Sequence, residues 1–199
     1  MKSESIAFGI AGIAFGLIAG WIIGTQQAPS RQPPAQATTA AAPAQANTRA
    51  AVLDEAKVTA LKSVAEREPS NAKPRIDLGN LYFDAERYDD AITWYEAAIK
   101  LAPRDVNLST DLGVCYYYTN QPDKALAQLD KSLAIDPKHA KTLLNLGIVR
   151  AFGKQDLAGA TRAWEQVMAI DPNSPEGQAA KRALDTLRSA HGGDAKPGA

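Results

Sequence analysis

The distribution of apolar and polar residues divides the chain into three segments. Residues 6–23 form an unbroken run without a charged or strongly polar side chain. Residues 25–50 contain prolines, alanines and glutamines but no Leu, Ile, Val or aromatic residue. From residue 52 to residue 189, apolar residues recur at spacings of three and four, which is the period of an amphipathic helix. The pattern predicts an apolar N-terminal helix, a linker and an all-α domain.

The apolar run has the length of a membrane-spanning helix. Its 18 residues would extend for about 27 Å, close to the roughly 30 Å hydrocarbon core of a bilayer. The apolar part of a cleaved signal peptide is shorter, about 7–15 residues, and the nearest candidate cleavage site, after Ala28, is followed by Pro29. We therefore expect residues 1–24 to be an uncleaved transmembrane signal anchor. Cleavage, which would release a soluble secreted protein, is the alternative.

Glycine occupies every fourth position of this run, at Gly12, Gly16, Gly20 and Gly24. Four residues advance the helix by slightly more than one turn, so these glycines lie on one slowly winding face. In lipid such a face allows two helices to approach closely. The pattern predicts a glycine zipper that joins copies of this chain, or that contacts a partner's membrane helix. Incidental spacing is the competing interpretation, because glycine is common in membrane helices.

The segment after the run is predicted to be a disordered linker. Residues 25–50 have too few large apolar side chains to form a core, and as a flexible coil they would span roughly 30 Å. Their composition is similar to that of periplasmic spacers in bacterial envelope proteins. The short segment before the apolar run and the long domain after it favour an N-terminus in the cytoplasm. In a bacterium this orientation places the α-helical domain in the periplasm. Residues 190–199 are predicted to be a disordered tail.

The α-helical part contains an internal repeat. Residues 72–105 and 106–139 align over 34 positions, and residues 140–174 follow with one extra residue. Each unit has a Leu-Gly pair, a small residue twelve or thirteen positions after that glycine, and a proline near its end. These are Leu78-Gly79, Leu112-Gly113 and Leu146-Gly147; Ala91, Ala125 and Ala160; and Pro103, Pro137 and Pro172. Small residues allow two helices to approach, and proline ends the second one.

This pattern resembles the tetratricopeptide repeat. The first unit also has the family's aromatic residues, Tyr82 and Tyr95, and its small residue Ala98. The resemblance implies an all-α helical solenoid of three repeats, flanked by capping helices over residues 52–68 and 175–189. The third unit departs from the family pattern at Arg150 and Val167. We place its extra residue between Gly153 and Ala160.

The resemblance also implies a function and a site. Tetratricopeptide arrays are interaction scaffolds whose first helices line a concave groove for a peptide or helix. At the equivalent positions this chain has Lys73, Ile76, Asn80, Phe83, Asn107, Thr110, Val114, Tyr117, Tyr118, Lys141, Leu144, Ile148 and Phe152, with Asp84 and Ala151 beside them. One subclass binds a C-terminal carboxylate. Only Asn80 and Lys141 match its residues, so an acidic chaperone tail is not the expected ligand.

Charge and chemistry narrow the function further. The 22 basic and 22 acidic residues cancel, and there is no basic stripe of the kind that binds nucleic acid. The single cysteine, Cys115, has neither a disulfide partner nor the neighbours of a metal site. No catalytic or phosphate-binding motif is present, so we expect no enzyme activity, no cofactor and no metal.

The sequence therefore predicts a membrane-tethered adaptor that binds a protein partner at the bacterial inner membrane. Assembly of envelope complexes, such as c-type cytochrome biogenesis or secretion machines, would suit it. A secreted chaperone, or an oligomeric structural component joined through the glycine zipper, are the alternatives.

Overall fold

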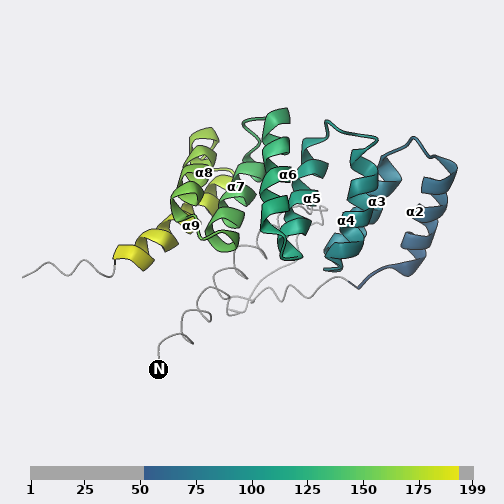
Figure 1. The fold of residues 1–199 in the computed structure, drawn as a ribbon, viewed down its shortest axis with the longest axis horizontal. Coiled ribbons are helices and arrows are strands. Elements are labelled where there is room, and N and C mark those ends of the chain that lie inside the picture. Colours follow the sequence, from purple (N-terminus) through teal and green to yellow (C-terminus); the bar gives the residue numbers. More distant parts are fainter. Residues whose placement is uncertain (1–51, 193–199) are drawn as a thin grey trace, which may run out of the picture. The chain divides into compact units, whose positions relative to one another are not determined.

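The computed structural model describes residues 52–192 (Figure 1). The predicted membrane helix with its four glycines, the predicted linker and residues 193–199 lie outside this range, so those expectations stay predictions. The described part is helical throughout and contains no strand. Its elements are α2 (Glu55–Arg67), α3 (Lys73–Asp84), α4 (Tyr88–Ile99), α5 (Val106–Tyr118), α6 (Pro122–Ile135), α7 (Ala140–Ile148), the π-helical turn η1 (Val149–Gly153), α8 (Leu157–Ile170) and α9 (Pro175–Gly192). The predicted all-α class is confirmed.

None of the helices between residues 52 and 192 combines the length and the apolar character that crossing a bilayer requires.

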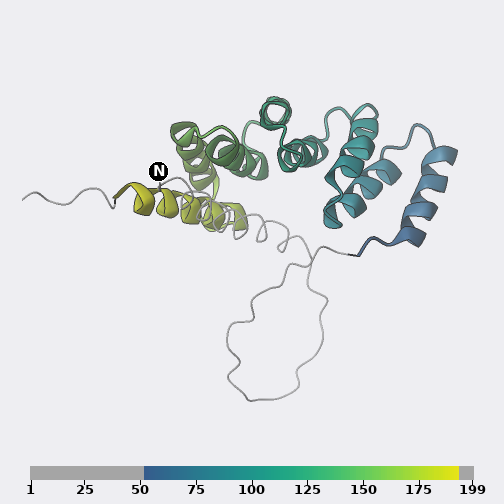
Figure 2. The same cartoon turned by 60° about the horizontal axis from the view of Figure 1, so that its bottom comes forward.

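The helices form a series of hairpins that stack in chain order. α3 packs against α4, α5 against α6, and α7 against α8, while α4 contacts α5 and α6 contacts α7. α2 lies against α3 at one end, and α9 lies against α8 and α7 at the other. Figures 1 and 2 show this order from blue to yellow. Each hairpin coincides with one sequence unit, and the predicted helical solenoid is confirmed.

Each hairpin closes over the glycine of its Leu-Gly pair. Gly79 faces the ring of Tyr95, and Gly147 faces the indole of Trp164, with no room for a methyl group between them. The alanines at the matching place in the second helices, Ala91, Ala125 and Ala160, have no exposed surface. Trp164 also donates a hydrogen bond from Nε1 to the carbonyl oxygen of Leu144, at 3.1 Å. Small residues on both helices thus let one large side chain fill the interface.

The turns inside the first two hairpins share one capping motif. Glu86 and Asn120 adopt left-handed conformations, with φ of 58° and 60°. The next amide in each turn donates back to the carbonyl of Tyr82 or of Tyr116, at 2.8 Å in both cases. This bond spans five residues and identifies a Schellman motif, which satisfies carbonyl groups at the end of a helix.

The third hairpin shows where the extra residue lies. There the corresponding bond runs from the Asp156 amide to the Arg150 carbonyl and spans six residues, at 2.8 Å. The left-handed residue, Gln155, follows Gly147 by eight positions, whereas Glu86 follows Gly79 by seven. The sequence separation between the left-handed residue and the fully buried alanine that follows it is the same in both hairpins, from Gln155 to Ala160 and from Glu86 to Ala91. The prediction that the insertion lies between Gly153 and Ala160 is therefore wrong. The helix absorbs the residue earlier, by widening into the π-helical turn η1.

α2 lies within the range expected for the first capping helix, and α9 begins at the first residue expected for the second. Asp54 caps α2, because its Oδ1 accepts a hydrogen bond from the Lys57 amide at 3.0 Å. On α9, Ala180 and Ala183 are buried against the last hairpin. α9 continues through Gly192, so the first three residues of the predicted disordered tail are helical.

We predict that Gly79→Ala and Gly147→Ala each lower the free energy of unfolding by about 1–3 kcal/mol, the usual cost of overpacking. The loss is expected although alanine favours a helix over glycine by about 1 kcal/mol. Gly113→Ala is the matched control. Its methyl group would lie 3.0 Å from Cγ of Leu129, a side chain that can move more easily than an aromatic ring. Urea unfolding followed by circular dichroism measures the difference, and equal losses at all three glycines would contradict it.

Candidate functional site

The predicted groove residues lie on the first helix of each hairpin, on α3, α5 and α7 with η1. Their exposure differs along the array. Lys73, Asn80 and Asn107 are exposed, whereas Ile76, Phe83, Tyr117, Tyr118, Lys141 and Phe152 are partly buried. Thr110, Val114, Leu144 and Ile148 are buried, the last two with 1% and 5% of their surface exposed. The side chains that a partner can reach in this structure are concentrated on α3 and α5.

Aromatic rings from two hairpins meet where the first helices end. The rings of Tyr88 and Tyr118 are stacked, with centroids 4.4 Å apart and planes 13° apart. Phe83 meets Tyr88 edge-on at 5.5 Å, and Tyr117 lies 5.9 Å from Tyr118. We call Phe83, Tyr88, Tyr117 and Tyr118 the aromatic row. It brings together three predicted groove residues and joins the first repeat to the second.

Tyr88 is a member of the row that the repeat pattern did not predict, because it begins the second helix of its hairpin. Its position directly across the turn from Phe83 is the signal that could have identified it. Burial raises the pKa of Tyr88 to about 12, and the nearby carboxylate of Glu86 acts in the same direction. The hydroxyl therefore stays protonated at neutral pH and keeps its capacity to donate a hydrogen bond.

The adjacent tyrosines of the YYY triplet have different surroundings. Tyr116 packs against two groups of buried residues, a first core cluster that includes Leu112 and a second that includes Leu129. Its hydroxyl donates to Glu96 Oε1 at 2.6 Å. Tyr117 packs against the second cluster and lies beside Gly153, where a methyl group would be 3.2 Å from its Cε2. Its ring thus packs within the chain while it also borders the row. Lys154, in the turn that follows η1, forms an ion pair with Asp123 at 2.7 Å, which links this turn to the start of α6.

A buried tyrosine orients Asn80. The hydroxyl of Tyr95 donates to Asn80 Oδ1 at 2.7 Å, and Tyr95 is only 2% exposed. The oxygen of this amide is therefore occupied from inside the hairpin. Its NH₂ group, which can donate two hydrogen bonds, is left for an acceptor outside. A backbone carbonyl of a bound segment has the required chemistry.

Both lysines of the predicted site are in ion pairs. Lys73 Nζ lies 3.0 Å from both carboxylate oxygens of Asp77, one helical turn further along α3. Lys141 Nζ lies 2.6 Å from Asp111 Oδ1 and links α7 to α5. The pattern of repeat positions did not predict either acid. The spacing of four between Lys73 and Asp77 was a readable signal, whereas the Asp111 pair depends on how two hairpins stack.

Thr110 takes part in a buried chain of hydroxyl groups. Its Oγ1 lies 2.7 Å from the Val106 carbonyl and 2.7 Å from Thr142 Oγ1, which in turn lies 2.7 Å from His139 Nδ1. Each hydroxyl has one proton. Because Thr110 donates to the carbonyl, Thr142 must donate to Thr110, and His139 Nδ1 must donate to Thr142. This predicted groove residue therefore connects α5 to α7 and is not open to a ligand.

Cys115 is fully buried, and this burial raises the pKa of its thiol, so the reactive thiolate is disfavoured. Between residues 52 and 192, no three side chains of the metal-ligating types come together.

The sequence matches two family models, both described as tetratricopeptide repeat. One covers residues 70–138 and the other residues 110–175, so together they span more than half of the 199 residues. The chain is a tetratricopeptide-repeat protein. Repeats of this family form a protein-interaction scaffold, and the fold is typically non-catalytic.

Several solved structures are similar to the described helices. A crystal structure of MamA is 20% identical with a TM-score of 0.56, covering 67% of this chain and 88% of that one. The Sgt2 domain from Aspergillus fumigatus is 24% identical with a TM-score of 0.54, covering 64% and 85%. The first tetratricopeptide domain of Spaghetti (RPAP3), solved bound to the HSP90 peptide SRMEEVD, is 26% identical with a TM-score of 0.55, covering 61% and 95%. No curated protein matches the sequence significantly.

We predict that Thr110→Val lowers the free energy of unfolding by about 1–3 kcal/mol, because it removes the hydroxyl to which the buried Thr142 donates and breaks the link from α5 to α7. Thr161→Val is the control. Thr161 also donates to the carbonyl four residues before it, at 2.9 Å, but no hydroxyl depends on it. We expect less than about 0.5 kcal/mol at that position. Urea unfolding measures both changes, and equal effects would show that the hydroxyl chain contributes nothing.

Proposed function

We propose that this tetratricopeptide-repeat protein is a membrane-tethered adaptor that binds an extended or helical segment of a protein partner in its groove. The observation that carries this proposal is the aromatic row next to the oriented amide of Asn80. Tyrosine and phenylalanine give large contact areas for a small loss of side-chain freedom. A fixed amide donor then gives the bound backbone its orientation.

The groove is suited to a ligand that is largely apolar. Both of its lysines are already paired with acids, so neither offers a free cation to an acidic tail. The similarity to the Spaghetti domain supports peptide binding as the mode of interaction, while the charges favour a ligand different from the one named there. Aromatic anchors surrounded by polar residues are the usual composition of a recognition hot spot.

The proposed tether consists of the apolar residues 6–23 and the linker that follows them. An anchor of this length with a linker reach of roughly 30 Å holds the groove close to the membrane and raises its effective concentration for partners there. We place the protein in a bacterial inner membrane, with the repeats in the periplasm. Recruitment of a client during assembly of an envelope complex, such as c-type cytochrome biogenesis, is the role that such a geometry serves.

Crosslinking in cells tests the groove. A photoreactive amino acid in place of Phe83 should capture a discrete protein partner, because this position lies in the aromatic row. The same amino acid in place of Ala134, an exposed residue of α6, is the matched control and should capture none. Tyr88→Ala should weaken the capture from position 83. Capture of lipid alone, or equal capture from both positions, would remove the support for the groove.

The membrane segment is tested by Gly16→Leu combined with Gly20→Leu. The protein should stay in the membrane fraction with its N-terminal segment intact, as mass spectrometry will show, but oligomers in mild detergent should be lost because the bulky residues separate the helices. Ile13→Leu with Leu17→Ile is the control and should change neither. A shortened, released protein would favour the secreted-chaperone alternative, and unchanged oligomers would show that the glycine spacing is incidental.

A further inference from the structure

The carboxylates around the groove outnumber its cations. The two lysines, Lys73 and Lys141, are accompanied by Asp77 and Asp111 as ion-pair partners. Two further acids, Asp84 and Glu86, follow at the end of α3, and within residues 52–192 neither has an ion-pair partner. Both are exposed. These two lysines and four acids have a formal charge of −2, and Lys57 on α2, whose charge also acts on Asp84, reduces it to −1.

The pair of Asp111 and Lys141 is sheltered from solvent. The side chains are 23% and 16% exposed, and their charged atoms are 2.6 Å apart. Attraction between two charges grows as water is excluded, so this pair is held more firmly than an exposed one such as Lys73–Asp77. A ligand carboxylate would have to compete with Asp111 for the charge of Lys141. The protein thus already holds a carboxylate of its own against this ammonium group.

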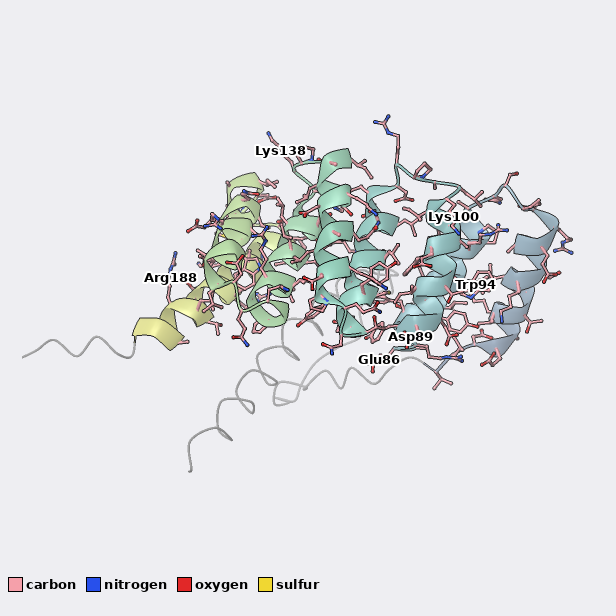
Figure 3. The ribbon with its side chains drawn as sticks, in the orientation of Figure 1. Glu86, Asp89, Trp94, Lys100, Lys138 and Arg188 are labelled. Carbon is pink, nitrogen blue, oxygen red and sulfur yellow. The ribbon has the colours of Figure 1, made fainter. Side chains whose placement is uncertain are left out.

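Of the two unpaired acids, Glu86 lies next to the aromatic row. Glu86 contributes to raising the pKa of both Tyr88 and Tyr118, for which burial is the larger cause. Figure 3 shows Glu86 beside Asp89 at the edge of the α3–α4 hairpin. Aromatic faces attract cations, and neighbouring carboxylates strengthen that attraction.

Asp84 and the nearby cations complete this electrostatic environment. Although Asp84 is exposed, partial desolvation raises the pKa of its carboxyl group. The charge of Lys57 on α2 opposes this shift, and the carboxylate of Asp111 adds to it. Arg87 does not compensate the acids of the groove, because its guanidinium bonds Asp90 at 2.7 Å and lies over the ring of Tyr82.

We propose that the groove selects a cationic segment, with Arg or Lys next to apolar residues, and rejects acidic tails. Asp84 and Asp111 are its specificity-determining residues. Asp84 attracts the cation of the ligand. Asp111 neutralises the charge of Lys141 and so weakens its attraction for anionic ligands. Discrimination by repulsion as well as attraction is a common way to separate partners. The inference rests on the proposed function and adds the chemistry of the bound segment.

Two labelled peptides test the selection with the full chain in detergent. One is SRMEEVD with a free C-terminus, the peptide in the Spaghetti structure. The other is the charge-reversed SRMKKVK with an amidated C-terminus. Fluorescence anisotropy should show at least tenfold tighter binding of the cationic peptide, and 0.5 M salt should weaken it because exposed charges are screened. Asp84→Asn should reduce the preference by roughly three- to fivefold, the scale of one exposed charge contact.

Asp111→Asn is expected to raise the affinity for SRMEEVD, because it releases Lys141. Asp130→Asn is the matched control. Asp130 is exposed on α6, in the second helix of its hairpin, and its substitution should change neither affinity. Circular dichroism confirms folding. Should Asp111→Asn unfold, the exposed Asp84→Asn decides the test alone.

Three results would overturn the inference. They are equal or tighter binding of SRMEEVD by the unsubstituted protein, an unchanged preference in Asp84→Asn, and no binding of the cationic peptide. Crosslinking from position 83 separates these failures from a failure of the proposed function. If a partner is still captured there, the groove binds proteins but does not select them by positive charge.

Discussion

The architecture depends on how closely the two helices of a hairpin approach each other. Gly79 and Gly147 leave space for a flat aromatic side chain from the second helix, Tyr95 in one hairpin and Trp164 in the other. This contact fixes the relative position of the helices, so the remaining faces of α3, α5 and α7 keep a regular orientation. In the first hairpin the same contact reaches the candidate site, because the Tyr95 ring that packs on Gly79 holds the Asn80 amide with its hydroxyl.

Features that repeat within one unit were predictable from the sequence. The Leu-Gly pairs, the buried alanines and the closing prolines recur at a fixed spacing, so the hairpins and their order followed directly. The place of the extra residue did not. An alignment shows that the third unit is longer but not which backbone segment widens, and the bond from Asp156 to Arg150 decides that in favour of η1.

The candidate site was predictable to the extent that repeat positions determine it. The positions of Phe83, Tyr118 and Asn80 follow from the pattern, and the structure brings the first two together. Tyr88 was missed because the repeat positions assigned to the groove lie on first helices only, whereas Tyr88 begins a second helix. Asp111 was missed because its contact with Lys141 joins two hairpins, and no spacing within one unit encodes it. The burial of Thr110 and Leu144 was not predicted for a related reason. The repeat pattern assigns the same position to the groove in every repeat, whereas the exposure of that position depends on the neighbouring repeats.

The third hairpin and the Asp111–Lys141 pair together affect how a long partner segment would bind. A perfectly periodic array would offer a bound segment several equivalent offsets, one repeat apart. Within residues 52–192 this degeneracy is broken. The π-helical turn occurs in the third repeat. Asp111 pairs with Lys141 of the next repeat. Its equivalent in the first repeat, Asp77, has Asn107 at the corresponding place in the next repeat and pairs with Lys73 of its own helix instead. A segment lying along these hairpins would therefore meet a different sequence of contacts at every offset, which would favour a single register.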